Sequence, residues 1–245
     1  MNIALQLWTV RALADEDLLA ALDTVAAIGY RAVEFAGFGG LPPHTIRRRL
    51  DALGLAATGA HLALDDLALR LPQTIEALTT IGAANAVLAS IVPDQRATPE
   101  QVEHLAERLN TIGDRLRAAG LRLVYHNEDY DFAPLGRSTL WHTIVERSDP
   151  ALLSAQLDIV TAVQQGVDPL ALLASHGARI SSIHCSEYAA GAYLPIGSGT
   201  TDWLQLIHAA RAAGVEWLIV EHDALAEPLA GAAASLAALT AAAAH

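Results

Sequence analysis

The chain alternates between helix-like stretches, in which hydrophobic residues recur every three or four positions, and short apolar runs of the kind that form buried strands. A glycine stands at six of the junctions from a helix-like stretch to an apolar run. Glycine is favoured at such a junction because it caps the end of a helix in a conformation that other residues avoid. These glycines are Gly29, Gly54, Gly82, Gly120, Gly177 and Gly214, and the runs after them lead to Glu34, His61, Ala89, Asn127, His184 and Glu221. Each junction predicts a helix that ends directly before a strand.

Two further strands complete the pattern. Residues 3–7 form an apolar run at the start of the chain, and the long interval between Gly120 and Gly177 has room for another strand over residues 153–157. The sequence therefore predicts eight strands.

The stretches between the strands have the period of amphipathic helices. Three apolar faces stand out, formed by Leu18, Leu22 and Val25, by Ile46, Leu50 and Leu53, and by Val102, Leu105, Leu109, Ile112 and Leu116. Thr98 and Gln101 form a capping box with Pro99 at the first helical position, while Pro43 and Asp202 are typical starts for two other helices.

Eight strands alternating with helices indicate an α/β protein, a (β/α)8 TIM barrel. The alternative is an open doubly wound sheet, which usually carries a glycine-rich loop after its first strand, and residues 7–11 do not form one. We find no linker or break in composition, so we interpret residues 1–245 as a single TIM-barrel domain.

Charge and composition narrow the classes of function. The chain has 27 acidic residues against 15 basic ones and a formal charge of -12, which argues against nucleic acid or an anionic membrane as a partner. All the basic residues are arginine, which excludes Schiff-base chemistry on lysine. The single cysteine, Cys185, and a start that does not resemble a signal peptide favour a cytoplasmic protein. The alanine-rich residues 229–244 predict a final surface helix that is too weakly apolar to span a bilayer.

Polar side chains stand where the predicted strands end, which is the part of a TIM barrel that carries its chemistry. These residues are Glu34, His61, His126, Asn127, Asp158, His184 and Glu221. Each alone is typical of a helix cap or a hydrogen-bonded core group, but together they indicate a site.

Asp158, His184 and Glu221 end three consecutive strands and should lie side by side. Two carboxylates and an imidazole suit a divalent ion such as Mn²⁺, Mg²⁺, Co²⁺ or Zn²⁺. A fourth ligand is expected from the fifth strand, where Glu128, Asp129 and Asp131 are the candidates. If His184 points into the barrel, its neighbour Cys185 points toward the helices and is a packing residue, and Ser186 points inward again.

The chain resembles the sugar phosphate isomerase/epimerase family, xylose-isomerase-like barrels that include inosose dehydratases and ketose 3-epimerases. The resemblance covers essentially the whole chain. It rests on residues 6–11 (QLWTVR), 28–35 (IGYRAVEF), 125–132 (YHNEDYDF), 157–158 with 166–169, His184, and 220–223 (VEHD).

The resemblance implies a metal held by Asp131, Asp158, His184 and Glu221, and a substrate that carries a carbonyl beside a hydroxyl carbon. It implies that a carboxylate removes the proton next to the carbonyl and that an acid returns one, through an enediolate. Glu221 is the first candidate for this acid/base role, with Glu128 or Asp131 as its partner. Glu34, His61 and His126 would then orient hydroxyl groups.

The chain departs from the family pattern at four places. Thr161, three positions after Asp158, stands where ketohexose epimerases carry a histidine. Glu128 stands where many relatives have a second histidine, Asp131 replaces a ligand glutamate, and Ser186 stands where the family has a lysine. The expected partner is a small-molecule sugar or cyclitol, and by analogy with relatives the chain is a possible homo-oligomer.

Three alternatives to a metal-dependent sugar isomerase or epimerase stay open. A lyase that removes water from a keto-cyclitol uses the same enediolate, and a barrel that has lost catalysis would bind a sugar or a partner. An endonuclease-IV-like enzyme needs a basic surface, whereas the only cluster of arginines is at residues 47–49. Trp8 is expected to stack on a sugar face or to close the core, and residues 197–199 to form a turn, a cover for the substrate or a phosphate-binding loop.

Overall fold

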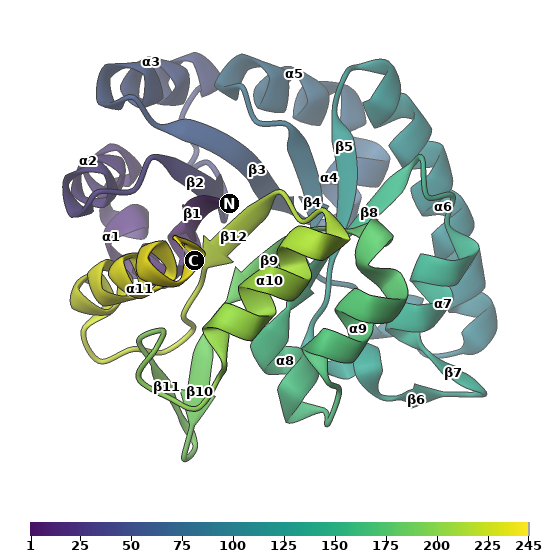
Figure 1. The fold of residues 1–245 in the computed structure, drawn as a ribbon. Coiled ribbons are helices and arrows are strands. Elements are labelled where there is room, and N and C mark those ends of the chain that lie inside the picture. The colour runs from purple at the N-terminus through teal and green to yellow at the C-terminus, as the bar shows by residue number, and fades with distance from the viewer. Residues whose placement is uncertain (245) are drawn as a thin grey trace.

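In the computed structural model, which describes residues 1–244, eight parallel strands close into a barrel (Figure 1). The strands are β1 (Asn2–Gln6), β2 (Ala32–Phe35), β3 (Ala56–Leu62), β4 (Asn85–Leu88), β5 (Arg122–His126), β8 (Leu153–Asp158), β9 (Ile180–Cys185) and β12 (Trp217–Val220). They follow one another around the barrel in chain order, and β1 pairs with both β2 and β12. This closure confirms the TIM barrel and excludes the open sheet. His245, the last residue of the predicted domain, lies outside the described residues.

Helices surround the barrel and connect its strands (Figure 1). They are α1 (Arg11–Glu16), α2 (Leu18–Ile28), α3 (Pro43–Leu53), α4 (Leu64–Leu69), α5 (Leu71–Ile81), α6 (Pro99–Ala118), α7 (Leu140–Arg147), α8 (Ile159–Gln164), α9 (Pro169–His176), α10 (Trp203–Ala213) and α11 (Pro228–Ala243). Short 3-10 turns are η1 (Leu7–Val10), η2 (Pro93–Gln95), η3 (Asp129–Phe132) and η4 (Gly177–Arg179). Two hairpins, β6 (Pro134–Leu135) with β7 (Ser138–Thr139) and β10 (Glu187–Ala189) with β11 (Ala192–Leu194), lie beyond the carboxyl ends of the strands.

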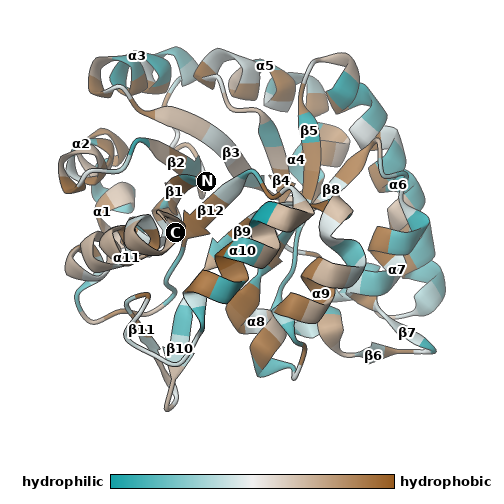
Figure 2. Ribbon diagram, in the orientation of Figure 1, coloured by the Kyte–Doolittle hydropathy of each residue, from teal (hydrophilic) through white to brown (hydrophobic). Residues whose placement is uncertain are grey.

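The predicted apolar faces are the ones that the helices bury. All five residues of the longest face, on α6, are buried, as are the three on α2; on α3, Ile46 and Leu50 are buried and Leu53 is partly so. Figure 2 shows the result, with apolar residues gathered along the barrel strands and more polar residues on much of the outer helical surface. The capping box at Thr98 and the starts at Pro43 and Asp202 are confirmed as well.

All six glycines follow a helix and precede a strand, as predicted, but Gly177 differs from the other five in its backbone conformation. Five of the glycines have positive φ, but Gly177 has φ -54° and begins the 3-10 turn that follows α9. A Cβ on Gly177 would lie 2.6 Å from Cβ of Ala213. Glycine is needed here because α10 approaches closely.

The C-terminal segment is helical, as predicted, and α11 buries Gly231, Ala232, Ser235 and Leu239. Among residues 1–244, we find no helix that is both long and apolar enough to cross a membrane.

A close approach of backbone to backbone also occurs at Gly113 on α6, where a Cβ would lie 2.3 Å from the carbonyl oxygen of Leu152. We expect Gly113→Ala to lower the free energy of unfolding by about 1–3 kcal/mol, because α6 would have to move away from the start of β8. Urea unfolding followed by tryptophan fluorescence measures the effect. Thr111→Ala, on the exposed face of α6, is the control and should change stability by less than about 0.5 kcal/mol. Equal stability of the two variants would contradict the prediction.

Candidate metal centre and active site

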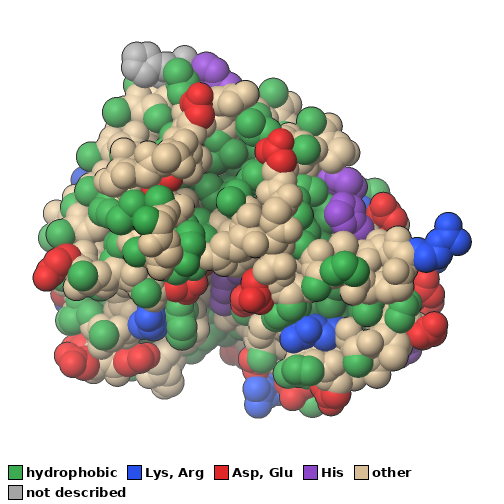
Figure 3. All heavy atoms as spheres, turned by 90° about the horizontal axis from the view of Figure 1, so that it is seen from below, with side chains coloured by type: hydrophobic (Ala, Val, Ile, Leu, Met, Phe, Trp, Pro, Cys, Tyr) green, Lys and Arg blue, Asp and Glu red, His purple; other side chains and the backbone are tan. Residues whose placement is uncertain are grey.

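The carboxyl ends of the strands surround an open cavity of about 520 Å³. Figure 3 looks onto this end of the barrel, where histidine is visible at the base of a central hollow. Six predicted site residues line the cavity: Trp8, His61, His126, Glu128, Asp158 and Glu221. Asp223, from the predicted VEHD motif, lines it too.

Three histidines meet in the centre, one each from β3, β5 and β9. The ring centroids of His61 and His126 are 4.8 Å apart, those of His126 and His184 are 4.7 Å apart, and the rings of His61 and His184 are stacked at 5.2 Å. All three side chains point into the barrel because they share the inward parity of their strands.

Glu34, from β2, lies beneath these rings and is 1% exposed. Its Oε2 is 2.9 Å from Nε2 of His61 and 2.9 Å from Nε2 of His184, and it also accepts a hydrogen bond from Nε2 of Gln6. Burial would raise the pKa of Glu34, but hydrogen bonds and charge from His184 and His61 outweigh it and lower the pKa below its ordinary value. Glu34 is not among the residues that line the cavity, so its position suits the anchoring of histidines better than contact with a substrate.

Gln156, on β8, completes this layer, and the sequence analysis missed it. Its Oε1 is 3.0 Å from Nε2 of His61 and 3.1 Å from Nδ1 of His126, and its Nε2 donates to Glu34 and to Oγ of Ser182. Strand parity could have found it, because Gln156 stands two residues before Asp158 and must point the same way.

Four buried side chains bring donor atoms within 4.8 Å of one another: His126, Asp158, His184 and Glu221. The geometry thus brings together three of the four residues expected to hold a metal. Nδ1 of His184 and Oε2 of Glu221 are 2.6 Å apart. Oδ1 of Asp158 accepts from the backbone N–H groups of Val160 and Thr161, where it caps α8.

Because these side chains lie close together, each shifts the pKa values of the others. Burial and then the charge of Glu221 raise the pKa of Asp158 to about 6. Burial opposes ionisation of Glu221 too, but the charge and hydrogen bond of His184 lower its pKa to about 2. The pKa of His184 is raised, because the two carboxylates of Glu221 and Glu34 outweigh the effect of its burial. The cluster therefore holds concentrated negative charge around one imidazole.

These residues fit a divalent metal. Carboxylate oxygens and imidazole nitrogens are ligands of Mn²⁺, Co²⁺ and Zn²⁺. A ligating histidine usually donates its second N–H to a carboxylate, and Glu34 accepts from Nε2 of His184 in that way. This contact leaves Nδ1 of His184, beside Glu221, as the nitrogen that can offer a lone pair once its proton is displaced.

The structure does not bring Asp131 to the other donors. Asp131 lies in η3, where its Oδ2 accepts a hydrogen bond of 2.7 Å from the backbone N–H of Glu128. It is 1% exposed, and burial raises its pKa to about 7, while the hydrogen bond from the backbone of Glu128 acts in the opposite direction. Tyr125 precedes His126 on β5 and therefore faces the helices, away from the barrel interior. The charge of Asp131 raises the pKa of Tyr125, which places Asp131 near that outer side, and the short turn uses its carboxylate as a cap. Asp129, the third candidate, is exposed.

Glu128 instead faces the cavity. Burial, followed by the charges of Asp158 and Glu221, raises its pKa to about 7. Its strand, β5, is separated from that of Glu221, β12, by β8 and β9 around the barrel. The two carboxyl groups therefore approach the cavity from different sides.

Trp8 forms part of the rim and is 44% exposed, so it does not close the core. Its indole N–H donates to Oδ1 of Asp223 at 2.9 Å, and the guanidinium of Arg11 lies over its ring. The hydroxyl of Tyr193, on β11, donates to the other oxygen of Asp223. These contacts hold an aromatic ring at the mouth of the cavity.

Cys185, the last residue of β9, and Ser186, which follows it, both lie outside the lining of the central cavity. Cys185 is fully buried in the hydrophobic core, as predicted. Ser186 donates its hydroxyl to the backbone carbonyl of Glu221 and does not line the central cavity. It therefore secures the end of β12 and stands outside the site.

Residues 197–199 form a turn, which is the first of the three alternatives expected for this loop. The backbone N–H groups of Gly197 and Thr201, the hydroxyl of Thr201 and the indole N–H of Trp203 all donate to the carboxylate of Glu187. A Cβ on Gly199 would lie 2.4 Å from this carboxylate. Since Glu187 already occupies these donors, they are not open to a phosphate group.

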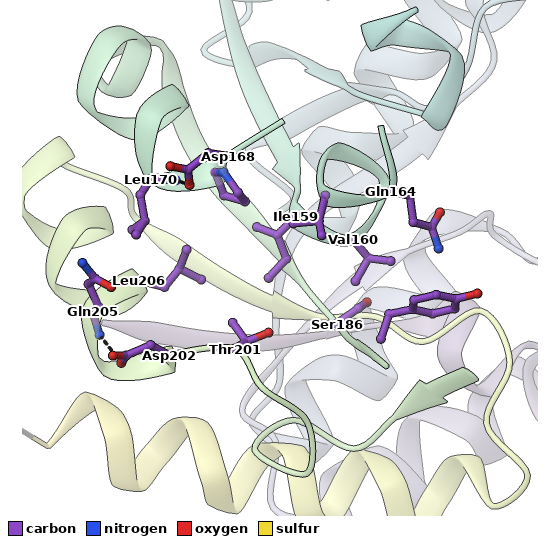
Figure 4. A pocket seen from close by; sticks show the side chains of 13 residues that line it. Ile159, Val160, Gln164, Asp168, Leu170, Ser186, Thr201, Asp202, Gln205 and Leu206 are labelled. Carbon is purple, nitrogen blue, oxygen red and sulfur yellow. Dashed lines mark hydrogen bonds between the residues drawn. The ribbon is translucent and has the colours of Figure 1, made fainter. Parts of the chain in front are cut away.

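A second cavity, of about 240 Å³, lies between α8, α9 and the start of α10 (Figure 4). Its apolar wall includes Ile159, Val160, Leu170 and Leu206. Asp202 caps α10 through the backbone N–H of Gln205, the contact dashed in Figure 4, and Asp168 caps α9 in the same way. Because its carboxylates serve the helices, this cavity lacks the converging donors of the central one.

Residues 22–242 match the family model described as "Xylose isomerase-like TIM barrel". A stretch of 90 residues, 37% of this chain, is 30% identical to an inosose dehydratase from Bacillus anthracis, and it spans 30% of that protein's length. The fold is similar to that of a sugar phosphate isomerase/epimerase from Parabacteroides distasonis, with a TM-score of 0.81, 17% identity, and coverage of 96% of this chain and 95% of that one. It is also similar to that of the protein IOLI with a bound zinc atom, with a TM-score of 0.76, 13% identity, and coverage of 99% and 98%.

Proposed function

Because the chain belongs to the xylose isomerase-like TIM barrel family, we propose that it is a divalent-metal-dependent isomerase or epimerase of a sugar, a sugar phosphate or a cyclitol. The observation that carries the proposal is the pairing of a buried metal-donor set with a second carboxyl group, Glu128, at the same cavity. A metal site alone would suit a binding protein. The added carboxyl group supplies the proton transfers of an isomerase.

Asp158, His184 and Glu221 would hold the metal. When bound, the ion would act as a Lewis acid that stabilises negative charge on adjacent oxygens of an enediolate. Glu34 contributes by fixing the ring of His184, since their contact at Nε2 sets both the tautomer and the orientation of the imidazole.

Glu221 and Glu128 are the proposed acid/base pair. Their pKa values, about 2 and about 7, lie far apart, so near neutral pH Glu221 is ionised while much of Glu128 keeps its proton. This separation is how two carboxyl groups divide the roles of base and acid. Glu221 removes the proton next to the carbonyl group, and Glu128 returns one from its own side of the cavity.

His61 lines the cavity and is proposed to orient a substrate hydroxyl group, while Trp8 stacks on an apolar face of the sugar. Glu34 takes part in binding through the histidines, because it lies beneath them and does not reach the cavity surface.

The direct test incubates the Mn²⁺- or Co²⁺-loaded protein with keto-sugars and inososes in D2O. Deuterium at the carbon next to the carbonyl group is the expected result, with a shifted sugar or epimer as product. Loss of water from an inosose would assign the lyase reaction instead. Tight metal binding without exchange for any substrate in the set would reject catalysis and favour a sugar-binding barrel.

We expect the exchange rate to fall as the pH rises through about 7. The acid/base pair must share one proton, and the group with the higher pKa, Glu128, loses that proton in this range. Glu128→Gln should lower the rate by about 100-fold or more and abolish this pH dependence. The profile is measured as kcat/KM for deuterium exchange between pH 5 and 9.

Glu227→Gln is a suitable control, because Glu227 is an exposed residue directly before α11 and does not line the cavity. A falling limb that survives in Glu128→Gln would assign the proton to another group.

A further inference from the structure

The proposed metal site has three protein ligands from β8, β9 and the end of β12, but none from β5. Asp131 cannot supply one from its position behind that strand, where the backbone of Glu128 holds its carboxylate. His126 is the β5 residue whose donor atom lies within 4.8 Å of those of Asp158, His184 and Glu221. A neutral histidine can ligate only through the nitrogen that lacks a proton, so the question is which nitrogen that is.

Glu34 fixes the orientation of the Gln156 side chain. An ionised carboxylate only accepts hydrogen bonds, so the end of Gln156 that lies 2.9 and 3.2 Å from the two Glu34 oxygens must be its NH2 group. The amide oxygen of Gln156 then necessarily faces His61 and His126.

Gln156 in turn fixes the proton of His126. The amide oxygen is an acceptor, so Nδ1 of His126, 3.1 Å away, must be the nitrogen that carries hydrogen. Nε2 of His126 is then left with a lone pair. His126 is 5% exposed, so its hydrogen bond with Gln156 is shielded from water.

The same reasoning excludes as metal ligands the ring nitrogens that face Glu34 and Gln156. Nitrogen atoms of His61, His126 and His184 also lie within 4.8 Å of one another. The nitrogens of these rings that face Glu34 and Gln156 are all donors, namely Nε2 of His61, Nδ1 of His126 and Nε2 of His184. Protonated nitrogens do not bind metals, so the layer around Glu34 is an outer shell of hydrogen bonds.

We propose that His126 is the fourth protein ligand of the metal, through Nε2, and that Gln156 is the positioning residue that presents it. The metal set is therefore His126, Asp158, His184 and Glu221. This inference rests on the proposed function for the presence of a metal. It assigns to His126 a role that the resemblance gave to a carboxylate on the same strand.

The protonation state of His126 is testable without metal. In metal-free protein labelled with ¹⁵N, long-range ¹H–¹⁵N correlation spectra should show His126 with its proton on Nδ1 and a bare Nε2. A proton on Nε2 would overturn the proposal. This measurement needs no variant, so it does not depend on the folding of one.

The Co²⁺-loaded protein tests ligation. Each ligating imidazole keeps one N–H, and Co²⁺ shifts that proton far outside the normal range of the spectrum. We expect two such exchangeable signals, from Nδ1–H of His126 and Nε2–H of His184. His126→Ala should leave one signal, whereas His61→Ala should keep two.

Gln156→Leu should weaken Co²⁺ binding by about 10–100-fold, the usual cost of removing an outer-shell partner. It should also speed solvent exchange of one of the two N–H signals. Ser182→Ala is the matched control, since it removes an acceptor of the Gln156 NH2 group and leaves the amide oxygen in place.

The outcomes separate the two proposals. One shifted signal in the wild type, with Co²⁺ bound, overturns the ligand role of His126 and leaves the metal site intact. Two signals with unchanged affinity in Gln156→Leu overturn the role of Gln156. Failure of the wild type to bind Co²⁺ or Mn²⁺ overturns the proposed function and this inference together.

Discussion

Replacement of Glu34 by leucine is expected to lower the free energy of unfolding by about 3–5 kcal/mol, the usual cost of removing one partner of a buried charge pair. The carboxylate accepts hydrogen bonds from Gln6, Gln156, His61 and His184, and 1% of the residue is exposed. Without it, the side-chain N–H groups of Gln6 and His184 that face it lose their acceptor, and the buried imidazole of His184 loses one of its two carboxylate partners. Urea unfolding of the metal-free protein measures the change.

Glu34→Gln separates the charge of this side chain from its shape, and Glu216→Gln is the surface control. Glu34→Gln keeps the size of the side chain but places an NH2 group among donors, so we expect it to be nearly as destabilising as leucine. Glu216→Gln removes a carboxylate from an exposed ion pair with Arg122 and should cost less than about 1 kcal/mol. Full stability of Glu34→Gln would mean that the hydrogen-bond layer tolerates a neutral centre.

Asp158→Asn is expected to weaken divalent-metal binding by more than about 100-fold, beyond the loss that outer-shell changes produce. Asparagine is chosen because Asp158 has two tasks. Its Oδ1 caps α8, and an asparagine oxygen can take over that task, whereas an amide group replaces the second carboxylate oxygen and removes its charge. Isothermal titration with Mn²⁺ measures the affinity, and thermal unfolding of the metal-free variant reports the cap.

Asp168→Asn is the matched control for this change. Asp168 caps α9 through the backbone N–H of Leu170, in the same manner, but lies outside the metal-donor set. We expect its metal affinity to equal that of the wild type. Unchanged affinity in Asp158→Asn would remove Asp158 from the ligands and relocate the proposed centre toward the histidines.

Much of the fold follows from patterns that are local in the chain. Eight strands, the buried faces of α2 and α6, and the caps at Thr98 and Asp202 were all predicted from period and residue type. The reason for glycine at position 177 was not predictable, because a glycine can serve either a positive φ or a close contact. Only the approach of Ala213, from a different helix, distinguishes the two uses.

The position of the site was predictable in the same way, but the contacts within it were not. Topology alone places His61, His126, Asp158, His184 and Glu221 at one end of the barrel, since the strands are parallel and end together. Which of these groups touch was not predictable. Glu34 meets Gln156 across 122 positions and His184 across 150, and no local pattern encodes such contacts.

The sequence by itself thus determined the strands and helices, the closure of a barrel and the residue types at its mouth, because periodicity and parity act along the chain. Only the tertiary structure decided how those residues are used. It bonded the carboxylate of Asp131 to the backbone of Glu128, away from the other donors. It also paired the donors of the loop before α10 with the carboxylate of Glu187, and placed Gln156 between Glu34 and two histidines. The physical reason is that a buried polar group is defined by its hydrogen-bond partners, and here those partners come from distant strands that meet only when the barrel closes.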